Sequence, residues 1–433
     1  MPGPFAPERW PAEMPPRYWL ANATVPAALR PAGLPSRLSL RIEGAHIGAV
    51  QPQAAADAPV FELDGATVLS GFVDAHTHLD KGDLLAAGLR PERELLAAVE
   101  RVRDDYVRWS EAELRQRIGF GLRCAYAHGT RALNSYCDWS EPTGPLAWRV
   151  LQDLRREWAG RLELTLTSLA PIDELADPAH AETIARAVAE GRGVLGWFVY
   201  PGAPIEWLPR AFDLAERFDL RLDFHVDEHL DPPQANLGAI ARLARKRGYG
   251  ARTVCGHACV LAALPPAECD TLLDAVAASG LALVALPFTN LYLQDAAAHG
   301  PRRTPRRRGL LPAHEARARG VPVAIGSDNH RDPFFPGGDL DPLQALALGA
   351  LALQLDDPVE DWADTITTTP ARLLHLAWDG VLRPGAPADL TLHPGRGSAE
   401  VLSRSGHGRQ LVRAGRRVQP LLPDPRELDT LRH

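Results

Sequence analysis

Two histidines lie one residue apart at the end of an apolar run, Gly71-Phe72-Val73-Asp74-Ala75-His76-Thr77-His78-Leu79-Asp80-Lys81. In a β-strand, residues i and i+2 point to the same face, so His76 and His78 are able to bind one metal ion together. A His-x-His pair alone also occurs on solvated strand faces and as a hydrogen-bonded pair in a core. The choice between these interpretations depends on which other residues accompany the pair.

Three further strand patterns end in residues of the types that bind metals. His225 ends an alternating run that starts at Leu220, His257 follows the strand pattern at 252–255, and Asp328 follows the one at 321–325. We therefore predict a metal site whose ligands are His76, His78, His225 and Asp328. Histidine nitrogens with one carboxylate suit zinc or iron, and zinc is the first expectation.

The same segments supply groups for hydrolysis. A divalent metal lowers the pKa of its water to about 7, which supplies hydroxide at neutral pH. We expect Asp328 to hold the hydroxide proton, and Glu228 to carry protons to a ring nitrogen and then to the leaving amine. His257 is expected to steer the hydroxide or the developing oxygen. The structural alternatives are a surface carboxylate for Glu228 and a hydrogen-bonded core histidine for His257.

Other metal motifs fit this region less well. Residues 225–229 also spell H-x-x-E-H, a zinc-protease pattern that requires a helix, but residues 220–224 alternate like a strand and Pro232-Pro233 follows soon after. Cys255 and Cys259 flank His257, yet strand and loop geometry would splay them. The P-C-x-x-C pattern of another zinc deaminase class is absent.

Short strand patterns occupy both ends of the chain. They lie at Tyr18–Val25, 38–42, 47–50 and Phe61–Leu69, and again at 388–392, 410–412 and 416–418. Closely spaced strands with tight turns are typical of a small β-sheet or sandwich. We predict one β-sandwich domain formed by residues 1–70 and 379–433.

Between these ends the pattern changes to strand followed by helix. Predicted helices include 84–106, 111–127, 146–158, 179–190, 208–218, 237–247 and 266–279, and the strands are 131–135, 162–169, 194–199, 221–225, 253–255, 281–286 and 321–325. With the strand before His76 there are eight, which predicts a (β/α)8 TIM barrel over residues 71–378. The catalytic rim of such a barrel lies at the C-terminal ends of its strands. Residues 301–309 are predicted to form a surface loop.

Composition excludes several classes of protein. The 433-residue chain is 45% hydrophobic and 23% charged with a net charge of −7, so it has no basic surface of the kind that binds nucleic acid. No run approaches the roughly 20 apolar residues that span a bilayer, and the proline-rich start lacks the apolar core of a secretion signal. We expect a cytoplasmic homo-oligomer whose partner is a small heterocyclic substrate.

Lysine is rare in this chain. Lys81 and Lys246 are the only two, against many arginines. Beside the histidine pair, the compact ammonium of Lys81 is a candidate for contact with the substrate. The alternative is a solvated charge on the rim.

The motifs together resemble the amidohydrolase superfamily, and within it the cytosine deaminase-like branch. The resemblance rests on G-F-V-D-A-H-T-H-L-D at 71–80, H-V-D-E at 225–228, G-H at 256–257, D-N-H-R-D-P-F-F-P at 328–336, the segments 287–290, 293–294 and 307–309, and G-A-P-A-D-L at 385–390. It implies a barrel with a flanking sandwich and hydrolytic removal of an amino group from a nitrogen heterocycle. It also implies the ligand set above, Glu228 as proton shuttle and His257 as hydroxide or carbonyl partner.

The resemblance also bears on the number of metal ions. Binuclear members of the superfamily use a carboxylated lysine on the fourth strand, and residues 194–200 contain none. One divalent metal ion is therefore expected.

The differences from the branch fall in the substrate pocket. Ala170-Pro171 replaces a P-Q pair whose glutamine reads the pyrimidine edge, and Asn134, Tyr136 and Asp138 stand in the places of an R-x-H-x-D motif. Asn329 replaces a second aspartate and Phe334 replaces a tryptophan that packs on the base. Substrate-binding residues are predicted to be Lys81, Asn329 and Phe334, and the substrate is expected to differ from cytosine.

These observations predict a metal-dependent deaminase of an aminopyrimidine, aminopurine, pterin, triazine or cyclic guanidine. The first alternative is hydrolysis of a cyclic amide or an N-alkylamine at the same site. A more remote alternative is a non-catalytic scaffold protein, because a fold does not fix a function. The residues leave open the roles of His330 and Arg331.

Overall fold

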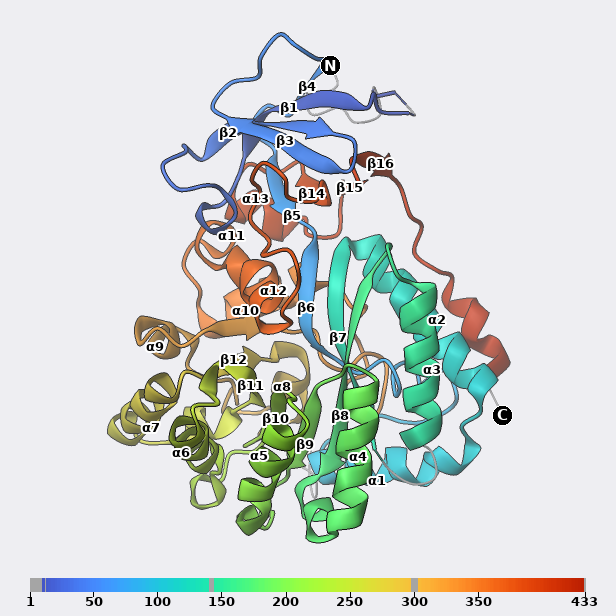
Figure 1. Cartoon of the computed structure of the whole chain (residues 1–433), viewed down its shortest axis with the longest axis vertical. Coiled ribbons are helices and arrows are strands. Elements are labelled where there is room, and N and C mark those ends of the chain that lie inside the picture. Colours follow the sequence, from blue (N-terminus) through green and yellow to red (C-terminus); the bar gives the residue numbers. More distant parts are fainter. Residues whose placement is uncertain (1–9, 12, 140–143, 297–302, 432–433) are drawn as a thin grey trace. The chain divides into compact units, whose positions relative to one another are not determined.

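The computed structural model describes residues 10–11, 13–139, 144–296 and 303–431 (Figure 1). The chain divides into two compact units, of which one comprises residues 1–74, 126–132 and 341–422. The other comprises residues 75–125, 133–340 and 423–433. Within the described ranges, no helix is long and apolar enough to cross a membrane.

The first unit is built on an eight-stranded sheet that combines both ends of the chain. Its strands are paired in the order β16-β15-β14-β5-β1-β2-β3, with β4 beside β1. The C-terminal strand β14 pairs antiparallel with the N-terminal strand β5, and Leu392 lies opposite Val68. Its strands are β1 Arg17–Thr24, β2 Arg37–Glu43, β3 His46–Gln51, β4 Val60–Glu62, β5 Thr67–Ser70, β14 Leu390–His393, β15 Gln410–Arg413 and β16 Arg416–Val418; its helices are α10 Pro342–Leu353, α11 Pro358–Trp362, α12 Thr368–Leu373 and α13 Ser398–Ser403.

The second unit is built on eight strands that pair in chain order from β6 to β13. Thr77 at the end of β6 forms a parallel bridge with Asp328 beyond β13, and the Asp328 amide donates to the His76 carbonyl at 2.8 Å. The first and last strands therefore meet and the sheet closes. The strands are β6 Phe72–Thr77, β7 Thr130–Asp138, β8 Glu163–Pro171, β9 Leu195–Val199, β10 Leu222–Val226, β11 Thr253–His257, β12 Ala282–Ala285 and β13 Val323–Ile325.

Helices alternate with these strands along the chain. They are α1 Leu95–Asp105, α2 Glu111–His128, α3 Gly144–Glu157, α4 Pro178–Glu190, α5 Leu208–Arg217, α6 Leu237–Arg247, α7 Pro266–Ser279, α8 Pro287–Leu293 and α9 Ala313–Ala318. Local signals set their ends: the Asp177 side chain caps the first amides of α4, and Gly248, with φ of 65°, ends α6. The predicted (β/α)8 barrel with a flanking β-domain from both termini is confirmed.

Two predicted elements were wrong in their bounds. The helix expected over 84–106 begins only at Leu95, because residues 79–88 form turns in which Asp83 (φ 63°) and Gly88 (φ 102°) adopt left-handed backbone. The strand expected over 61–69 is interrupted by a turn at Asp64 (φ 48°) and Gly65 (φ 82°). In both places the apolar pattern of the sequence continues through the turn, so the pattern alone does not predict where the helix or strand is interrupted.

Candidate active site

Histidine nitrogens and one carboxylate oxygen converge at the C-terminal ends of the barrel strands. The Oδ1 atom of Asp328, just beyond β13, lies 3.4 Å from His76 Nε2 on β6 and 3.3 Å from Nε2 of His78, which follows that strand. His225 Nε2 on β10 lies 3.2 Å from His78 Nε2. All four predicted ligands are therefore brought together by the fold.

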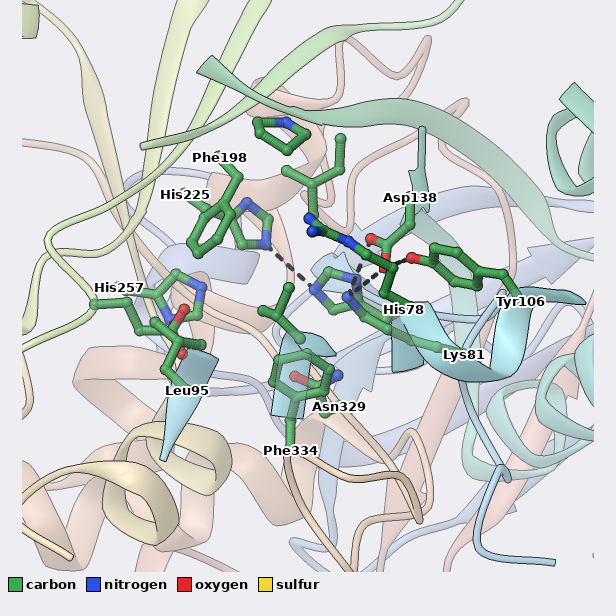
Figure 2. A pocket seen from close by; sticks show the side chains of 15 residues that line it. His78, Lys81, Leu95, Tyr106, Asp138, Phe198, His225, His257, Asn329 and Phe334 are labelled. Carbon is green, nitrogen blue, oxygen red and sulfur yellow. Dashed lines mark hydrogen bonds and ion pairs between the residues drawn. The ribbon is translucent and has the colours of Figure 1, made fainter. Parts of the chain in front are cut away.

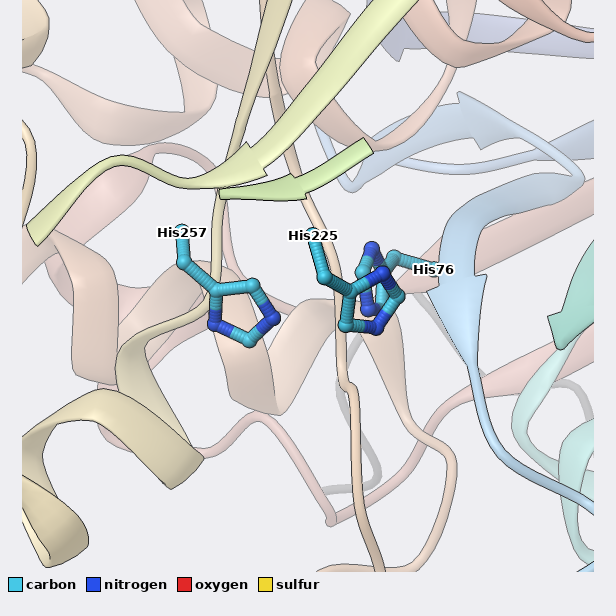
Figure 3. A group of neighbouring side chains, drawn as sticks. All are labelled: His76, His225 and His257. Atoms are coloured by element: carbon cyan, nitrogen blue, oxygen red, sulfur yellow. The ribbon is translucent and has the colours of Figure 1, made fainter. Parts of the chain in front are cut away.

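A second group of ring nitrogens adjoins the first. His76, His225 and His257 each offer a nitrogen, and the three atoms lie within 4.8 Å of one another (Figure 3). His257 ends β11, which pairs with β10. The neighbouring strands thus bring His257 beside the predicted ligands.

The backbone around His76 is tightly constrained. A Cβ atom at Gly256 would lie 2.9 Å from His76 Cε1, and one at Gly326 would lie 2.9 Å from His76 Cβ, so only glycine leaves room for the ring. His257 (φ 70°) and Asp328 (φ 61°) adopt left-handed backbone, which non-glycine residues rarely do. Such conformations cluster at functional sites, where the surrounding structure compensates for their cost.

Burial keeps the imidazoles neutral. It lowers the pKa of His78 and of His257 to about 3 and that of His225 well below its usual value. Asp328 behaves oppositely: burial alone would raise its pKa, but contacts with His76 and His78 hold it well below the usual range. Neutral imidazoles with free lone pairs and an ionised carboxylate are the forms that bind a cation.

Several buried polar atoms in this cluster make no hydrogen bond within the described residues. They include both side-chain oxygens of Asp328 and Nε2 of His257. Buried polar atoms without partners are costly, and a divalent cation coordinated by the oxygens would satisfy Asp328. The donor set of histidine nitrogens and one carboxylate suits zinc or iron. The cluster is therefore able to hold a metal ion.

Glu228 and His257 lie together beside the predicted ligands. Glu228 Oε1 is 3.4 Å from His257 Nδ1, and burial, followed by the charge of Asp328, raises the pKa of Glu228 well above its usual value. The amide nitrogen of Asn290 on α8 lies 2.9 Å from His257 Nδ1. With the amide oriented to donate, His257 carries its proton on Nε2. Gln294 donates to the Glu228 carbonyl at 3.1 Å.

A cavity that is partly open to solvent adjoins these groups. One end is lined by His78, His225, His257 and Glu228, and the remainder by Lys81, Leu95, Val99, Arg103, Tyr106, Asp138, Leu169, Pro171, Phe198, Asn329 and Phe334. Figure 2 shows His257 and Phe198 on one side of the cavity and Lys81, Asp138 and Tyr106 on the other. Of the predicted catalytic and substrate-binding residues, the cavity is lined by Glu228, His257, Lys81, Asn329 and Phe334.

The three predicted substrate-binding residues differ in their contacts. Lys81 is 4% exposed, which rules out the solvated rim charge, and its ammonium lies 4.6 Å from the centre of the Phe334 ring. Asn329 donates from its amide to Asp332 at 2.7 Å and accepts from Thr289 at 3.4 Å. The side chain of Asn329 is thus held by the protein while it lines the cavity.

His330 and Arg331 are not among the described residues that line this cavity. Arg331 instead donates to Asp83 at 2.5 Å and to Asp339 at 2.7 Å. Backbone bonds from Asp83 to the His330 carbonyl and from Leu85 to the Arg331 carbonyl, each 3.1 Å, join the loops that follow β6 and β13. Both residues therefore hold the loops that carry Lys81 and Phe334.

The competing motifs do not form sites. Residues 225–229 lie on the end of β10 and in the loop after it, so the helix that H-x-x-E-H requires is absent. Cys255 and Cys259 are buried free thiols outside the metal-competent groups found among the described residues. Of the predicted loop at 301–309, residues 303–309 form no helix or strand, and residues 301–302 lie outside the described ranges.

Tyr136 is a site residue whose importance was not predicted. Its ring centre lies 4.2 Å from that of His76, 5.1 Å from that of His78 and 4.5 Å from that of His225. Asn290 and Asp138 were also absent from the predicted set, although both lie in segments that carry the resemblance or its departures. The only sign of these two residues in the sequence was their position in a motif. Their contacts could not be predicted, because they depend on the fold.

Comparison with known proteins agrees with the site. A profile described as "Amidohydrolase family" matches residues 101–418. A pterin deaminase of Rhizobium rhizogenes is 36% identical over 96% of this chain and 97% of the relative. The chain belongs to the amidohydrolase family. It is a cytosine deaminase-like hydrolase of non-peptide C–N bonds, which leaves no ground for the scaffold alternative.

Two solved structures are similar along most of the chain. One is the 5-methylcytosine deaminase of Klebsiella pneumoniae liganded with 5-fluorocytosine, with a TM-score of 0.79, 25% identity and coverage of 94% of this chain and 98% of that one. The other is N-isopropylammelide isopropylaminohydrolase of Burkholderia multivorans, with a TM-score of 0.74, 26% identity and coverage of 93% and 98%.

Proposed function

We propose that this amidohydrolase removes an amino group hydrolytically from a small nitrogen heterocycle, using one divalent metal ion held by His76, His78, His225 and Asp328. The observation that carries the proposal is the convergence of these four side chains beside Glu228 and His257 at one end of the partly open cavity. The substrate classes are those expected from the sequence: aminopyrimidines, aminopurines, pterins, triazines and cyclic guanidines.

The bound metal would act as a Lewis acid that lowers the pKa of water. Zinc is our first candidate and iron the second, since both accept these ligands. A single ion is favoured because β9, the fourth strand, provides no lysine at 195–199 that could be carboxylated to bridge two ions.

The side chains then divide the proton transfers. Asp328, held ionised, accepts a proton from the attacking water, and Glu228, held protonated by its raised pKa, donates to the ring nitrogen. His257 offers its Nε2 proton to the oxygen that joins the ring carbon. A C–O bond forms between the water oxygen and the ring carbon. Glu228, ionised by its donation, takes up the proton that Asp328 accepted and passes it to the amino group, and the C–N bond breaks as ammonia leaves. The hydroxyl proton of the new carbonyl then returns to Glu228, which restores both carboxyl groups.

Pterin is the first candidate substrate. The support is the relative named pterin deaminase, which matches nearly the full length of the chain at 36% identity. Cytosine is a weaker candidate because Pro171, at the end of β8, lines the cavity and offers no amide to read a pyrimidine edge.

Hydrolysis of an N-alkylamine or a cyclic amide is the second candidate. The observation that favours it is the apolar wall of Leu95, Leu169 and Phe198, which would accept an alkyl group. The similarity to N-isopropylammelide isopropylaminohydrolase points in the same direction.

The test is product analysis with metal-reconstituted full-length protein. The panel contains pterin, isocytosine, cytosine, guanine, melamine, creatinine and an N-isopropylamino triazine, with Asp328→Ala as the background control. Ammonia from at least one ring, absent with the variant, supports the deaminase. Alkylamine or an opened ring as the only product supports the second candidate, and no product from any compound overturns both.

Two further proposals concern the protein as a whole. We propose that it works as a homo-oligomer in the cytoplasm. Within the described residues, no helix is long and apolar enough to cross a membrane. Light scattering after gel filtration would give the mass in solution, and a mass of about 47 kDa, that of one chain, would contradict the oligomer. Recovery of the native protein outside the cytoplasmic fraction would contradict the location.

A further inference from the structure

A buried ion pair lies across the cavity from His257. Lys81 Nζ donates to both oxygens of Asp138, at 3.1 and 3.2 Å, and the Tyr106 hydroxyl donates to Asp138 Oδ2 at 2.7 Å (Figure 2). The side chains of Lys81 and Asp138 are 5% and 16% exposed. All three residues line the same cavity as the predicted ligands His78 and His225.

The pair is fixed in position by its backbone. Asp80 accepts a hydrogen bond from the Lys81 amide at 2.9 Å and from the Asp138 amide at 2.7 Å, which ties the loop after β6 to the end of β7. Arg117 donates to the carbonyls of Asp80 and Gly82, at 2.6 and 3.0 Å. The two charges are therefore presented to the cavity by a rigid frame.

Stability alone does not explain such a pair. Burying two charges costs desolvation that their attraction often does not recover, so apolar residues of similar size would serve the fold equally well. Although burial alone would lower the pKa of Lys81, the carboxylates of Asp138, Asp80 and Asp332 raise it. Lys81 in turn lowers the pKa of Asp138 against the effect of burial. Both groups are charged, and each keeps hydrogen-bonding capacity.

After these contacts, Lys81 still has an N–H to donate, and Asp138 beside it still has an oxygen that is able to accept a hydrogen bond. An ammonium has three N–H groups, and Asp138 takes at most two of those of Lys81. Among the described residues, Oδ1 of Asp138 accepts from Lys81 alone, whereas Oδ2 accepts from Lys81 and Tyr106. Lys81 Nζ and Asp138 Oδ1 lie 3.1 Å apart. A donor and an acceptor at this spacing are able to pair with a ring carbonyl oxygen and the ring N–H beside it, respectively.

We propose that Lys81 and Asp138 together read the lactam edge of the substrate, with Lys81 donating to the ring carbonyl oxygen and Asp138 Oδ1 accepting from the adjacent ring N–H. The proposal rests on the deaminase function and narrows its substrates to rings that contain a 2-amino-4-oxopyrimidine, alone or fused. In these rings the amino-bearing carbon adjoins the lactam N–H. The amino group would then face the histidines and Glu228, and the lactam would face the pair, because both groups line the same cavity.

The pair would exclude rings with another pattern. Cytosine and adenine place an unprotonated nitrogen next to the amino-bearing carbon, which would face the Asp138 carboxylate. A 2,4-diamino ring presents a nitrogen acceptor and an amino donor in the reverse order. Sites that hydrogen-bond a substrate reject the analogue that leaves buried groups unpaired, by factors up to about 10⁵.

The test compares matched rings on the metal-reconstituted, full-length enzyme. kcat/KM for ammonia release is measured with pterin against 2,4-diaminopteridine and with isocytosine against 2,4-diaminopyrimidine. The expected result is a preference for the lactam of at least about 100-fold in one pair or both. A ratio below about tenfold, or a preference for the diamino ring, overturns the inference.

Variants then test whether Lys81 and Asp138 cause the preference for the lactam ring. Asp138→Asn and Lys81→Met each leave one buried charge without its partner, whereas the double variant removes both charges and keeps the volume, so it remains testable if the single variants unfold. The double variant should bind metal and lose at least about tenfold of the lactam preference. Lys246→Met, which changes the exposed second lysine, should leave the preference unchanged.

The outcomes separate this inference from the function on which it rests. A purely structural role would lower kcat/KM for both rings of a pair alike and leave their ratio intact in the folded double variant, which would overturn the inference. Ammonia released only from cytosine, adenine or another ring without the 2-amino-4-oxo pattern would also overturn it while the deaminase stands. No ammonia from any ring would overturn the deaminase itself.

Discussion

The two ends of the cavity are lined by different kinds of side chain. The metal end consists of neutral histidines and one carboxylate at the ends of rigid barrel strands, with left-handed backbone at Asp328 and His257. The opposite end consists of a charged pair, Lys81 and Asp138, covered by Phe334 from the loop after β13. This difference supports the proposed division, in which the barrel rim would carry out the reaction and side chains from loops and one strand end would select the ring.

The largest effect should come from the metal end. Replacing His78 by Ala removes a predicted ligand and should abolish measurable ammonia release, because partners outside the ligand shell alone change metal affinity by about 10- to 100-fold. Metal content by mass spectrometry should fall in parallel. His407→Ala, at an exposed histidine, is the matched control and should change neither quantity. An active His78→Ala enzyme with full metal would break the proposed division of the cavity.

The next largest effect separates proton transfer from metal binding. Glu228→Gln keeps the shape of the side chain but removes its proton chemistry, so kcat should fall about 10²- to 10⁴-fold while metal content stays at the wild-type level. Steady-state kinetics with metal analysis makes the measurement, and Glu206→Gln at an exposed position is the control. A kcat within a few-fold of wild type would remove Glu228 from the catalytic end.

A smaller effect on kcat should follow from removing the side chain that holds His257 in place. Asn290→Ala removes the amide that lies 2.9 Å from His257 Nδ1 and should lower kcat by about 10- to 100-fold with little change in metal content. Asn290→Asp is the informative partner variant, because a carboxylate would favour a proton on Nδ1 and so remove it from Nε2. If Asn290→Asp is fully active, the tautomer proposed for His257 is wrong.

The smallest effect should come from the selecting end and should act on binding. Phe334→Leu removes a ring that lies 4.6 Å from the Lys81 ammonium and lines the cavity. KM should rise by about threefold to tenfold with kcat nearly constant, in keeping with the usual strength of aromatic and cation–π contacts. Phe335→Leu is the control, because that ring packs on Phe288 at 5.2 Å and is not among the residues that line the cavity. A fall in kcat alone would show that the two ends are not separable.

Much of the fold was predictable from local patterns. The strand before His76 and the runs that end at His225 and His257 show a period of two or a continuous apolar core, and the barrel follows from eight strand–helix units. The start of α1 was not predictable, because the left-handed turn at Asp83 and Gly88 interrupts an apolar pattern without changing it.

Part of the site was also predictable from the sequence, and part was not. The predicted ligands gather because strand ends share one rim, which depends on the topology alone. The partnership of Lys81 with Asp138 spans 57 residues of sequence, and that of Asn290 with His257 spans 33. Such contacts depend on where a loop or helix crosses the rim, which no local pattern records.

We propose that one metal ion at the histidine–aspartate cluster drives hydrolysis of a C–N bond. The most direct test titrates zinc, and separately ferrous iron, into metal-free protein while ammonia release from a saturating active heterocycle is followed. Activity is expected to rise from zero in proportion to added metal and to stop rising at one equivalent per chain. Activity that persists without metal, or that rises until two equivalents are bound, would contradict it.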